Sequence, residues 1–175
     1  MTALIVLVGA ILFARTPAFQ WFVLKTSLRA NFPQIRWLST SELAQWLADP
    51  ALIQPTLLDV RTSAEFEVSH LPNARRVEPD ATPEGAAAGL AKETPIVTYC
   101  AVGFRSGQLA RRLGAAGFTN VRNLEGSAFA WANEHRPLQR SDGQPTREVH
   151  PYSAWWGGLL TDDVRAPLPI AAAQN

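Results

Sequence analysis

The residues best suited to chemistry form one short stretch, Tyr99-Cys100-Ala101-Val102-Gly103-Phe104-Arg105-Ser106. Cys100 is the one cysteine of the chain, so neither an intrachain disulfide nor a cysteine-based zinc site can form. A lone cysteine is most often a small buried hydrophobic residue. Here the neighbouring glycine, arginine and serine favour a reactive role, because they are typical of a loop that leads into a helix.

Predicted elements on either side would hold this stretch at the end of a sheet. Pro95–Tyr99 is rich in β-branched and aromatic residues, which indicates a buried strand ending at Cys100. Ser106–Ala116 has the apolar spacing of a helix, and Gly117 is placed to end it. In open α/β sheets, ligands gather at the carboxyl ends of the strands.

Such a position suits nucleophilic chemistry. Loop N–H groups and a helix N-terminus together favour negative charge. A Cys100 thiolate in that setting would be a competent nucleophile. Arg105 would order the loop and add a permanent cation, which favours an anionic substrate.

The rest of the chain alternates between strand and helix patterns. Further strands are predicted at Arg36–Leu38, Thr56–Val60, Ala74–Val77 and Thr119–Val121. Helices are predicted after the capping boxes Ser39-Thr40-Ser41-Glu42 and Thr62-Ser63-Ala64-Glu65, and at Pro83–Ala91 and Ser127–Glu134. This alternation indicates an α/β fold with a parallel sheet covered on both faces.

The stretch from Cys100 resembles the active-site loop of the rhodanese family, whose single-domain members carry Cys-x-x-Gly-x-Arg-Ser after a strand that ends in an aromatic residue. Two more segments are similar to the family in order and spacing. They are Leu58-Asp59-Val60-Arg61 with Glu65-Phe66 and His70-Leu71-Pro72-Asn73-Ala74, and Asn123-Leu124-Glu125-Gly126-Ser127 with Trp131 and Pro137-Leu138. The similarity covers about residues 36–139. Asn73 and Ser69 stand where the family usually has glycine, and Gly126 is one glycine where two are common.

The resemblance implies a five-stranded parallel sheet flanked by helices and a persulfide on Cys100. It implies a sulfurtransferase that moves a sulfane sulfur from an anionic donor such as thiosulfate to a thiol or to cyanide. The residues expected to hold the transferred sulfur are Ala101, Val102, Gly103, Phe104, Arg105 and Ser106. Asp59 and Arg61, at the end of a predicted strand, are expected to form an ion pair that supports the loop. Neither a metal site nor a cofactor is predicted.

Loop length distinguishes sulfur transfer from phosphate chemistry. Related phosphatases use Cys-x5-Arg to wrap a phosphate, whereas four residues separate Cys100 from Arg105 here. The shorter loop makes a smaller cradle, which suits a sulfane sulfur better than a phosphoryl group.

The N-terminal segment, residues 1–34, is predicted to contain a hydrophobic helix. Ala3–Ala14 is apolar and uncharged, but it reaches the length of a membrane span only if it continues to Leu24. Residues 3–24 are therefore interpreted as a membrane anchor, a secretory signal peptide or a buried helix. If the segment is an anchor, the basic residues that follow it would place the domain on the cytoplasmic side of the membrane. A buried helix would instead indicate a soluble cytoplasmic protein, and a signal peptide an exported one.

The net charge and the hydrophobic ends of the chain indicate which classes of partner to expect. A net charge of +1 gives no indication of nucleic-acid binding. The C-terminal extension, residues 140–175, contains Tyr152, Trp155 and Trp156 and is expected to pack on another surface. The hydrophobic ends leave open a second function, a membrane-tethered sulfur carrier or binding module that serves a partner protein with little turnover of small molecules.

Overall fold

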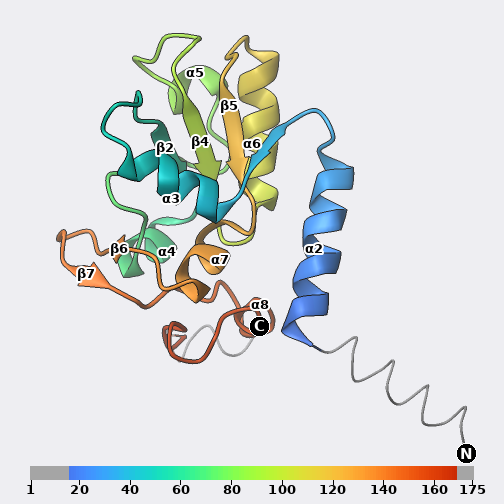
Figure 1. The fold of residues 1–175 in the computed structure, drawn as a ribbon, viewed down its shortest axis with the longest axis vertical. Coiled ribbons are helices and arrows are strands. Elements are labelled where there is room, and N and C mark those ends of the chain that lie inside the picture. The colour runs from blue at the N-terminus through green and yellow to red at the C-terminus, as the bar shows by residue number, and fades with distance from the viewer. Residues whose placement is uncertain (1–15, 169–175) are drawn as a thin grey trace, which may run out of the picture.

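The computed structural model describes residues 16–168 of the chain. Its centre is a five-stranded sheet in the order β1-β5-β4-β2-β3, and every pair of neighbouring strands is parallel. The strands are β1 (Arg36–Leu38), β2 (Thr56–Asp59), β3 (Arg75–Arg76), β4 (Ile96–Tyr99) and β5 (Val121–Leu124). The predicted five-stranded parallel sheet is therefore confirmed (Figure 1).

Helices cover the sheet and extend the chain at both ends. They are α2 (Pro17–Asn31), α3 (Thr40–Ala48), α4 (Ser63–Val68), α5 (Pro83–Ala86), α6 (Phe104–Ala115), α7 (Ser127–Asn133) and α8 (Ala154–Gly157). A small antiparallel pair, β6 (Leu138–Gln139) and β7 (Pro145–Thr146), lies outside the main sheet. Both predicted capping boxes are confirmed, at the starts of α3 and α4.

Several predicted boundaries were wrong. The helix predicted to begin at Ser106 begins at Phe104. The helix expected over Pro83–Ala91 ends at Ala86, because Ala87 leaves helical geometry and Gly89 adopts a left-handed backbone with φ of 78°. The last strand begins at Val121 instead of Thr119, because the Thr119 N–H donates to the Lys92 carbonyl and not to a strand neighbour.

Side chains that alternate along β4 belong to two apolar clusters, one on each face of the sheet. Ile96 and Cys100 belong to the apolar cluster that contains residues of α5 and α6. Val97 and Tyr99 belong to the cluster on the opposite face, with residues of α3 and α7. Because successive side chains of a strand point to opposite faces, β4 directs Cys100 to the α6 side of the sheet.

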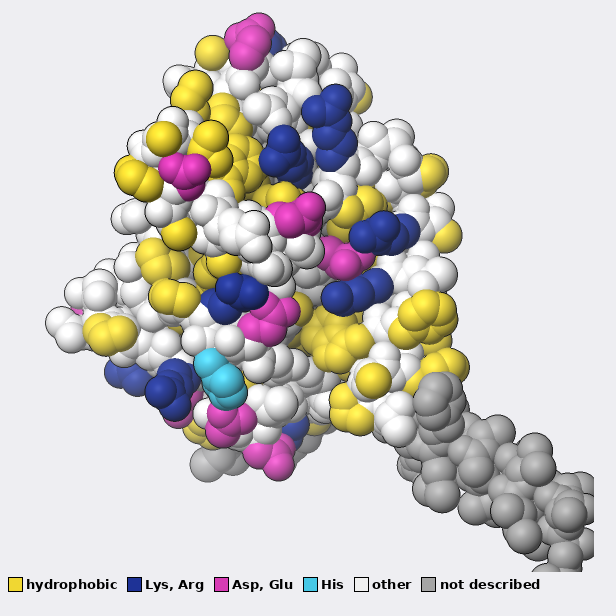
Figure 2. Space-filling model, in the orientation of Figure 1, with side chains coloured by type: hydrophobic (Ala, Val, Ile, Leu, Met, Phe, Trp, Pro, Cys, Tyr) yellow, Lys and Arg dark blue, Asp and Glu magenta, His cyan; other side chains and the backbone are white. Residues whose placement is uncertain are grey.

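Helix α2 packs against the domain at the sheet edge formed by β1 and near α6. Leu28 and Phe32 are buried at its C-terminal end. Two ion pairs to Glu125 hold the helix in place, from Arg29 at 2.7 Å and from Lys25 at 3.6 Å. Figure 2 shows hydrophobic side chains gathered on the surface near the start of the described chain, where Phe22 is 66% exposed.

The predicted membrane segment, residues 3–24, lies only partly within the described residues. Ala3–Ala14 lies outside the described residues. Among residues 16–168, no helix combines the length and apolar character needed to cross a bilayer. The anchor and the cytoplasmic orientation of the domain stay predictions.

The C-terminal extension packs on the same side of the sheet as α3 and α7. Val149, Leu159, Leu160 and Val164 are buried in that core cluster. The Asn133 side-chain amide at the end of α7 donates to the Leu159 carbonyl at 2.8 Å. Figure 1 shows that this path brings α8 next to the start of α2, so the two chain extensions meet below the sheet.

A buried ion pair closes the end of β2. The Arg61 guanidinium donates to both carboxylate oxygens of Asp59, at 2.6 to 3.1 Å, and to the Ser69 carbonyl at 2.6 Å. Both charged side chains are 0% exposed. The pair ties β2 to the turn after α4, and the Arg61 guanidinium lies 5.7 Å from the centre of the Tyr99 ring.

Removing one charge of this pair is expected to destabilise the protein strongly. Asp59→Asn leaves the buried Arg61 charge uncompensated, and we expect a loss of about 3 kcal/mol in the free energy of unfolding, measured by urea titration. Glu78→Gln is the matched control, because it breaks the exposed Arg76–Glu78 pair and should hardly move the midpoint. Equal effects of the two substitutions would contradict this account.

Candidate active site

The Cys100 thiol lies in a tight connection between a strand and a helix. Cys100 follows β4 directly, and α6 begins four residues later at Phe104. Gly103 caps the helix with φ of 119°, a conformation that L side chains rarely adopt. This backbone lets the Gly103 N–H donate to Cys100 Sγ at 3.1 Å. A sulfur at this position therefore receives a backbone donor next to a helix N-terminus, which favours negative charge.

Three polar side chains hold the loop from behind. The Asn123 amide donates to the Gly103 carbonyl at 2.9 Å, while the Thr98 hydroxyl donates to Asn123 Oδ1 at 3.0 Å. The Ser127 hydroxyl accepts from the Cys100 N–H at 3.2 Å and donates to the Leu124 carbonyl. All three side chains are buried, so they are positioning groups.

The sequence did not single out these three residues as part of the site. Asn123 and Ser127 lie within the third segment that resembles the rhodanese family, which was the signal available for them. Thr98 carried no signal beyond its β-branched side chain in a predicted strand.

Arg105 binds a carboxylate of α4. Its guanidinium donates to both Glu65 oxygens, at 2.7 and 2.8 Å. Glu65 also accepts from the Thr62 N–H and hydroxyl as the second half of the capping box. One carboxylate thus fixes both the start of α4 and the first turn of α6.

The charges of this pair stabilise each other. Burial acts to raise the pKa of Glu65, but the hydrogen bonds and charge of Arg105 outweigh it and hold that pKa below its usual 4.5. Burial acts to lower the pKa of Arg105, whereas the Glu65 hydrogen bonds and the nearby charge of Cys100 raise it above its usual value. Arg105 is therefore permanently charged and largely neutralised by its partner.

A small cavity of about 220 Å³ gives access to the thiol. Cys100 is 1% exposed, and its surface faces this cavity. Of the predicted site residues, Ala101, Val102, Phe104 and Arg105 also line it. Ser106 does not: its side chain is buried without a hydrogen-bond partner.

The outer walls of the cavity come from the two ends of the chain. Leu24 and Leu28 of α2 form one wall. Tyr152 and Trp156 form the other, and the Tyr152 ring centre lies 4.9 Å from the Arg105 guanidinium carbon. These contributions were not predicted, because nothing in the local sequence indicates where the extensions pack.

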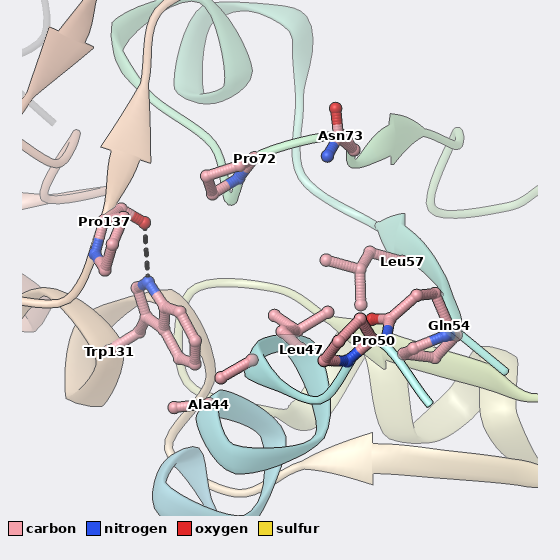
Figure 3. Close-up of a pocket in the computed structure, with 11 residues that line it drawn as sticks. Ala44, Leu47, Pro50, Gln54, Leu57, Pro72, Asn73, Trp131 and Pro137 are labelled. Atoms are coloured by element: carbon pink, nitrogen blue, oxygen red, sulfur yellow. Dashed lines mark hydrogen bonds between the residues drawn. The ribbon is translucent and has the colours of Figure 1, made fainter. Parts of the chain in front are cut away.

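A larger hollow of about 710 Å³ lies between α3, the start of β2 and α7 (Figure 3). Leu47, Leu57 and Trp131 line it, and the Trp131 indole donates to the Pro137 carbonyl at 2.8 Å. No charged side chain and no residue of the Cys100 loop lines it among residues 16–168. The hollow thus lacks the nucleophiles and acid–base groups that catalysis requires.

The histidines and carboxylates do not form a second centre. His70 stacks on Phe66, with ring centres 3.8 Å apart, and its Nδ1 lies 3.1 Å from the Phe66 carbonyl. Within the described part of the chain, no group of three histidine, cysteine or acidic side chains could hold a metal ion.

Comparison with known proteins points to one family. The model of the family described as "Rhodanese-like domain" matches residues 39–134. A protein named sulfurtransferase from Allochromatium vinosum is 31% identical over 106 residues, which cover 61% of this chain and 96% of that protein. The crystal structure of a rhodanese-like domain protein from Staphylococcus aureus superimposes with a TM-score of 0.53 at 28% identity, covering 61% of this chain and 99% of that one.

A further relative is a domain of a longer protein. The probable adenylyltransferase/sulfurtransferase MoeZ of Mycobacterium tuberculosis is 30% identical over 103 residues. The match covers 57% of this chain and only 25% of MoeZ. The similarity therefore extends over only a quarter of MoeZ.

The Glu65–Arg105 pair predicts a specific dependence of stability on pH. Because the Glu65 pKa is lowered in the folded protein, its contribution is present above about 4.5 and is lost as the pH falls through the lower folded value. We expect Glu65→Gln to cost about 2 kcal/mol near neutral pH, measured by urea unfolding, with a deficit that shrinks in acid.

Glu67→Gln is the control, since Glu67 is an exposed carboxylate of the same helix. It removes the same charge without touching Arg105. A Glu65→Gln deficit that stays constant down to strongly acidic pH would contradict the assigned role of the pair.

Proposed function

The chain belongs to the rhodanese-like domain family, and from that premise we propose that it is a sulfurtransferase carrying a sulfane sulfur on Cys100. The observation that carries the proposal is the contact between the Gly103 N–H and Cys100 Sγ at the base of an accessible cavity. It places the thiol where negative charge is favoured and where a small molecule can reach it.

The first half-reaction loads the enzyme. The Cys100 thiolate attacks the outer sulfur of a donor such as thiosulfate, and a new S–S bond forms. The S–S bond of the donor breaks, and its electron pair leaves with sulfite. The persulfide that remains lies inside the cavity, and its outer sulfur takes up a proton from solvent before the second half-reaction.

The second half-reaction returns the enzyme to its starting state. An acceptor, either a thiolate or cyanide, attacks the outer sulfur of the persulfide. The bond between the two enzyme sulfurs breaks, and the electron pair returns to Cys100 Sγ. The hydrogen bond from Gly103 then stabilises the thiolate as the leaving group.

A second candidate is a sulfur carrier that serves one protein partner and turns over small molecules poorly. Large exposed hydrophobic side chains beside the cavity favour it, since Phe104 lines the cavity and Trp155 next to Trp156 is 77% exposed. Such residues are suited to a protein contact. Both candidates share the Cys100 persulfide and differ in the acceptor.

Sulfur loading is the direct test of the proposed chemistry. We expect the intact mass of the protein to increase by one sulfur atom after incubation with thiosulfate or with polysulfide, and cyanide should reverse the increase. Cys100 is the one cysteine of the chain, so Cys100→Ser is a complete negative control. An unchanged mass with both donors would refute the proposal.

Steady-state kinetics separates the two candidates. A sulfurtransferase that turns over freely alternates between two enzyme forms. Double-reciprocal plots of initial rate against thiosulfate concentration, at several fixed cyanide concentrations, should therefore be parallel lines. Intersecting lines would show that both substrates bind together and would contradict double displacement. Stoichiometric loading followed by negligible turnover would favour the partner-specific carrier.

A further inference from the structure

The cavity above Cys100 has largely apolar walls, and its polar groups, the Gly103 N–H and Arg105, belong to the loop that holds the sulfur. Of the described residues that line it, only Arg105 carries a formal charge. Its Nη1 and Nη2 groups each donate to Glu65, and the Tyr152 ring centre lies 4.9 Å from the guanidinium carbon. A charged group on the part of an acceptor that lies away from the sulfur would therefore lose hydration against these walls without a cation beside it.

The walls of the cavity are instead apolar and closely fitted. Leu24 and Leu28 of α2 line the cavity together with Tyr152 and Trp156. Helix α2 lies against the loop, because a Cβ built on Gly103 would be in van der Waals contact with a Leu28 methyl carbon, at 3.4 Å. The Phe32 and Phe104 rings meet edge to face, with centres 5.6 Å apart, and add to this contact.

Size limits what can enter. About 220 Å³ lies below the range of about 300–1,000 Å³ typical of pockets for drug-sized ligands. The cavity fits a single short chain or one ring. Because Cys100 is 1% exposed and faces this cavity, an acceptor must pass the apolar walls to reach the sulfur.

We propose that the sulfur acceptor is a small thiol carried on an uncharged apolar chain or ring, which Leu24, Leu28, Tyr152 and Trp156 hold against the Cys100 persulfide. This inference rests on the proposed persulfide chemistry and names the class of acceptor. The four residues lie outside the segment matched by the family model, residues 39–134, so the selectivity belongs to the chain extensions.

The transfer step is balanced without a further reactant. The acceptor thiolate attacks the outer sulfur of the protonated persulfide, and an S–S bond forms between them. The bond from the outer sulfur to Cys100 Sγ breaks, and its electron pair stays on Sγ. The product is the persulfide of the apolar thiol, which keeps the proton.

The test compares two uncharged thiols that differ only in chain length. Full-length protein is loaded with sulfur, and mass spectrometry then follows single-turnover transfer to mercaptopropanol or mercaptohexanol, both with terminal thiols. A buried methylene contributes about fourfold to binding. With three additional methylenes, we expect mercaptohexanol to react about tenfold faster or more at low thiol concentrations.

Variants locate the effect. Leu24→Ala and Trp156→Ala are each expected to lower the rate ratio by about fourfold or more, since each removes apolar wall. Phe22→Ala is the matched control for Leu24→Ala. It removes a side chain larger than leucine from an exposed position of α2 and should preserve the rate ratio. Cyanide has no chain, so it should unload all four proteins at similar rates.

These readouts separate the two claims. A wild-type ratio near one, or a ratio that neither wall variant lowers, overturns the apolar acceptor even when cyanide unloads the protein normally. A protein that never takes up sulfur overturns the proposed function and this inference with it. If Trp156→Ala fails to fold, Leu24→Ala against Phe22→Ala still decides the question.

Discussion

Arg105 reaches from the first turn of α6 to α4 and binds the Glu65 carboxylate through two hydrogen bonds. The contact fixes the helix whose N-terminus faces Cys100, so the geometry of the sulfur site depends on it. It also neutralises the one formal charge among the described residues of the cavity wall. A single ion pair thus stabilises the loop and makes the entrance to the thiol apolar.

This arrangement explains how a buried cysteine can be reactive. Cys100 shares a core cluster with Leu109 and Ala110 of α6, which by itself would suit an inert thiol. Its sulfur nevertheless receives the Gly103 N–H and faces a cavity. The backbone supplies the polar contact, and most of the side chains that line the cavity are apolar. Both features favour a transfer that leaves the negative charge on Cys100 Sγ in a site of low polarity.

The sequence predicted those parts of the site that depend on local patterns. The buried strand before Cys100, the capping boxes and the loop with Gly103 all follow from adjacent residues. The contributions of Asn123 and Ser127 depend on hydrogen bonds to residues 20 and 27 positions away, so no local pattern reveals them. The walls formed by Leu24 and Trp156 depend on how both chain ends pack. The sequence indicated only that these ends are hydrophobic.

The central claim is that Cys100 holds the transferred sulfur inside the cavity between α2 and α8. A crystal structure of the protein treated with a sulfur donor, phased with the anomalous signal of sulfur, tests it most directly. The account predicts a second anomalous peak at bonding distance from Cys100 Sγ, on the side lined by Leu28 and Trp156. An unmodified Cys100 thiol in crystals of protein whose intact mass shows one added sulfur would contradict it. So would an added sulfur bound at any other residue.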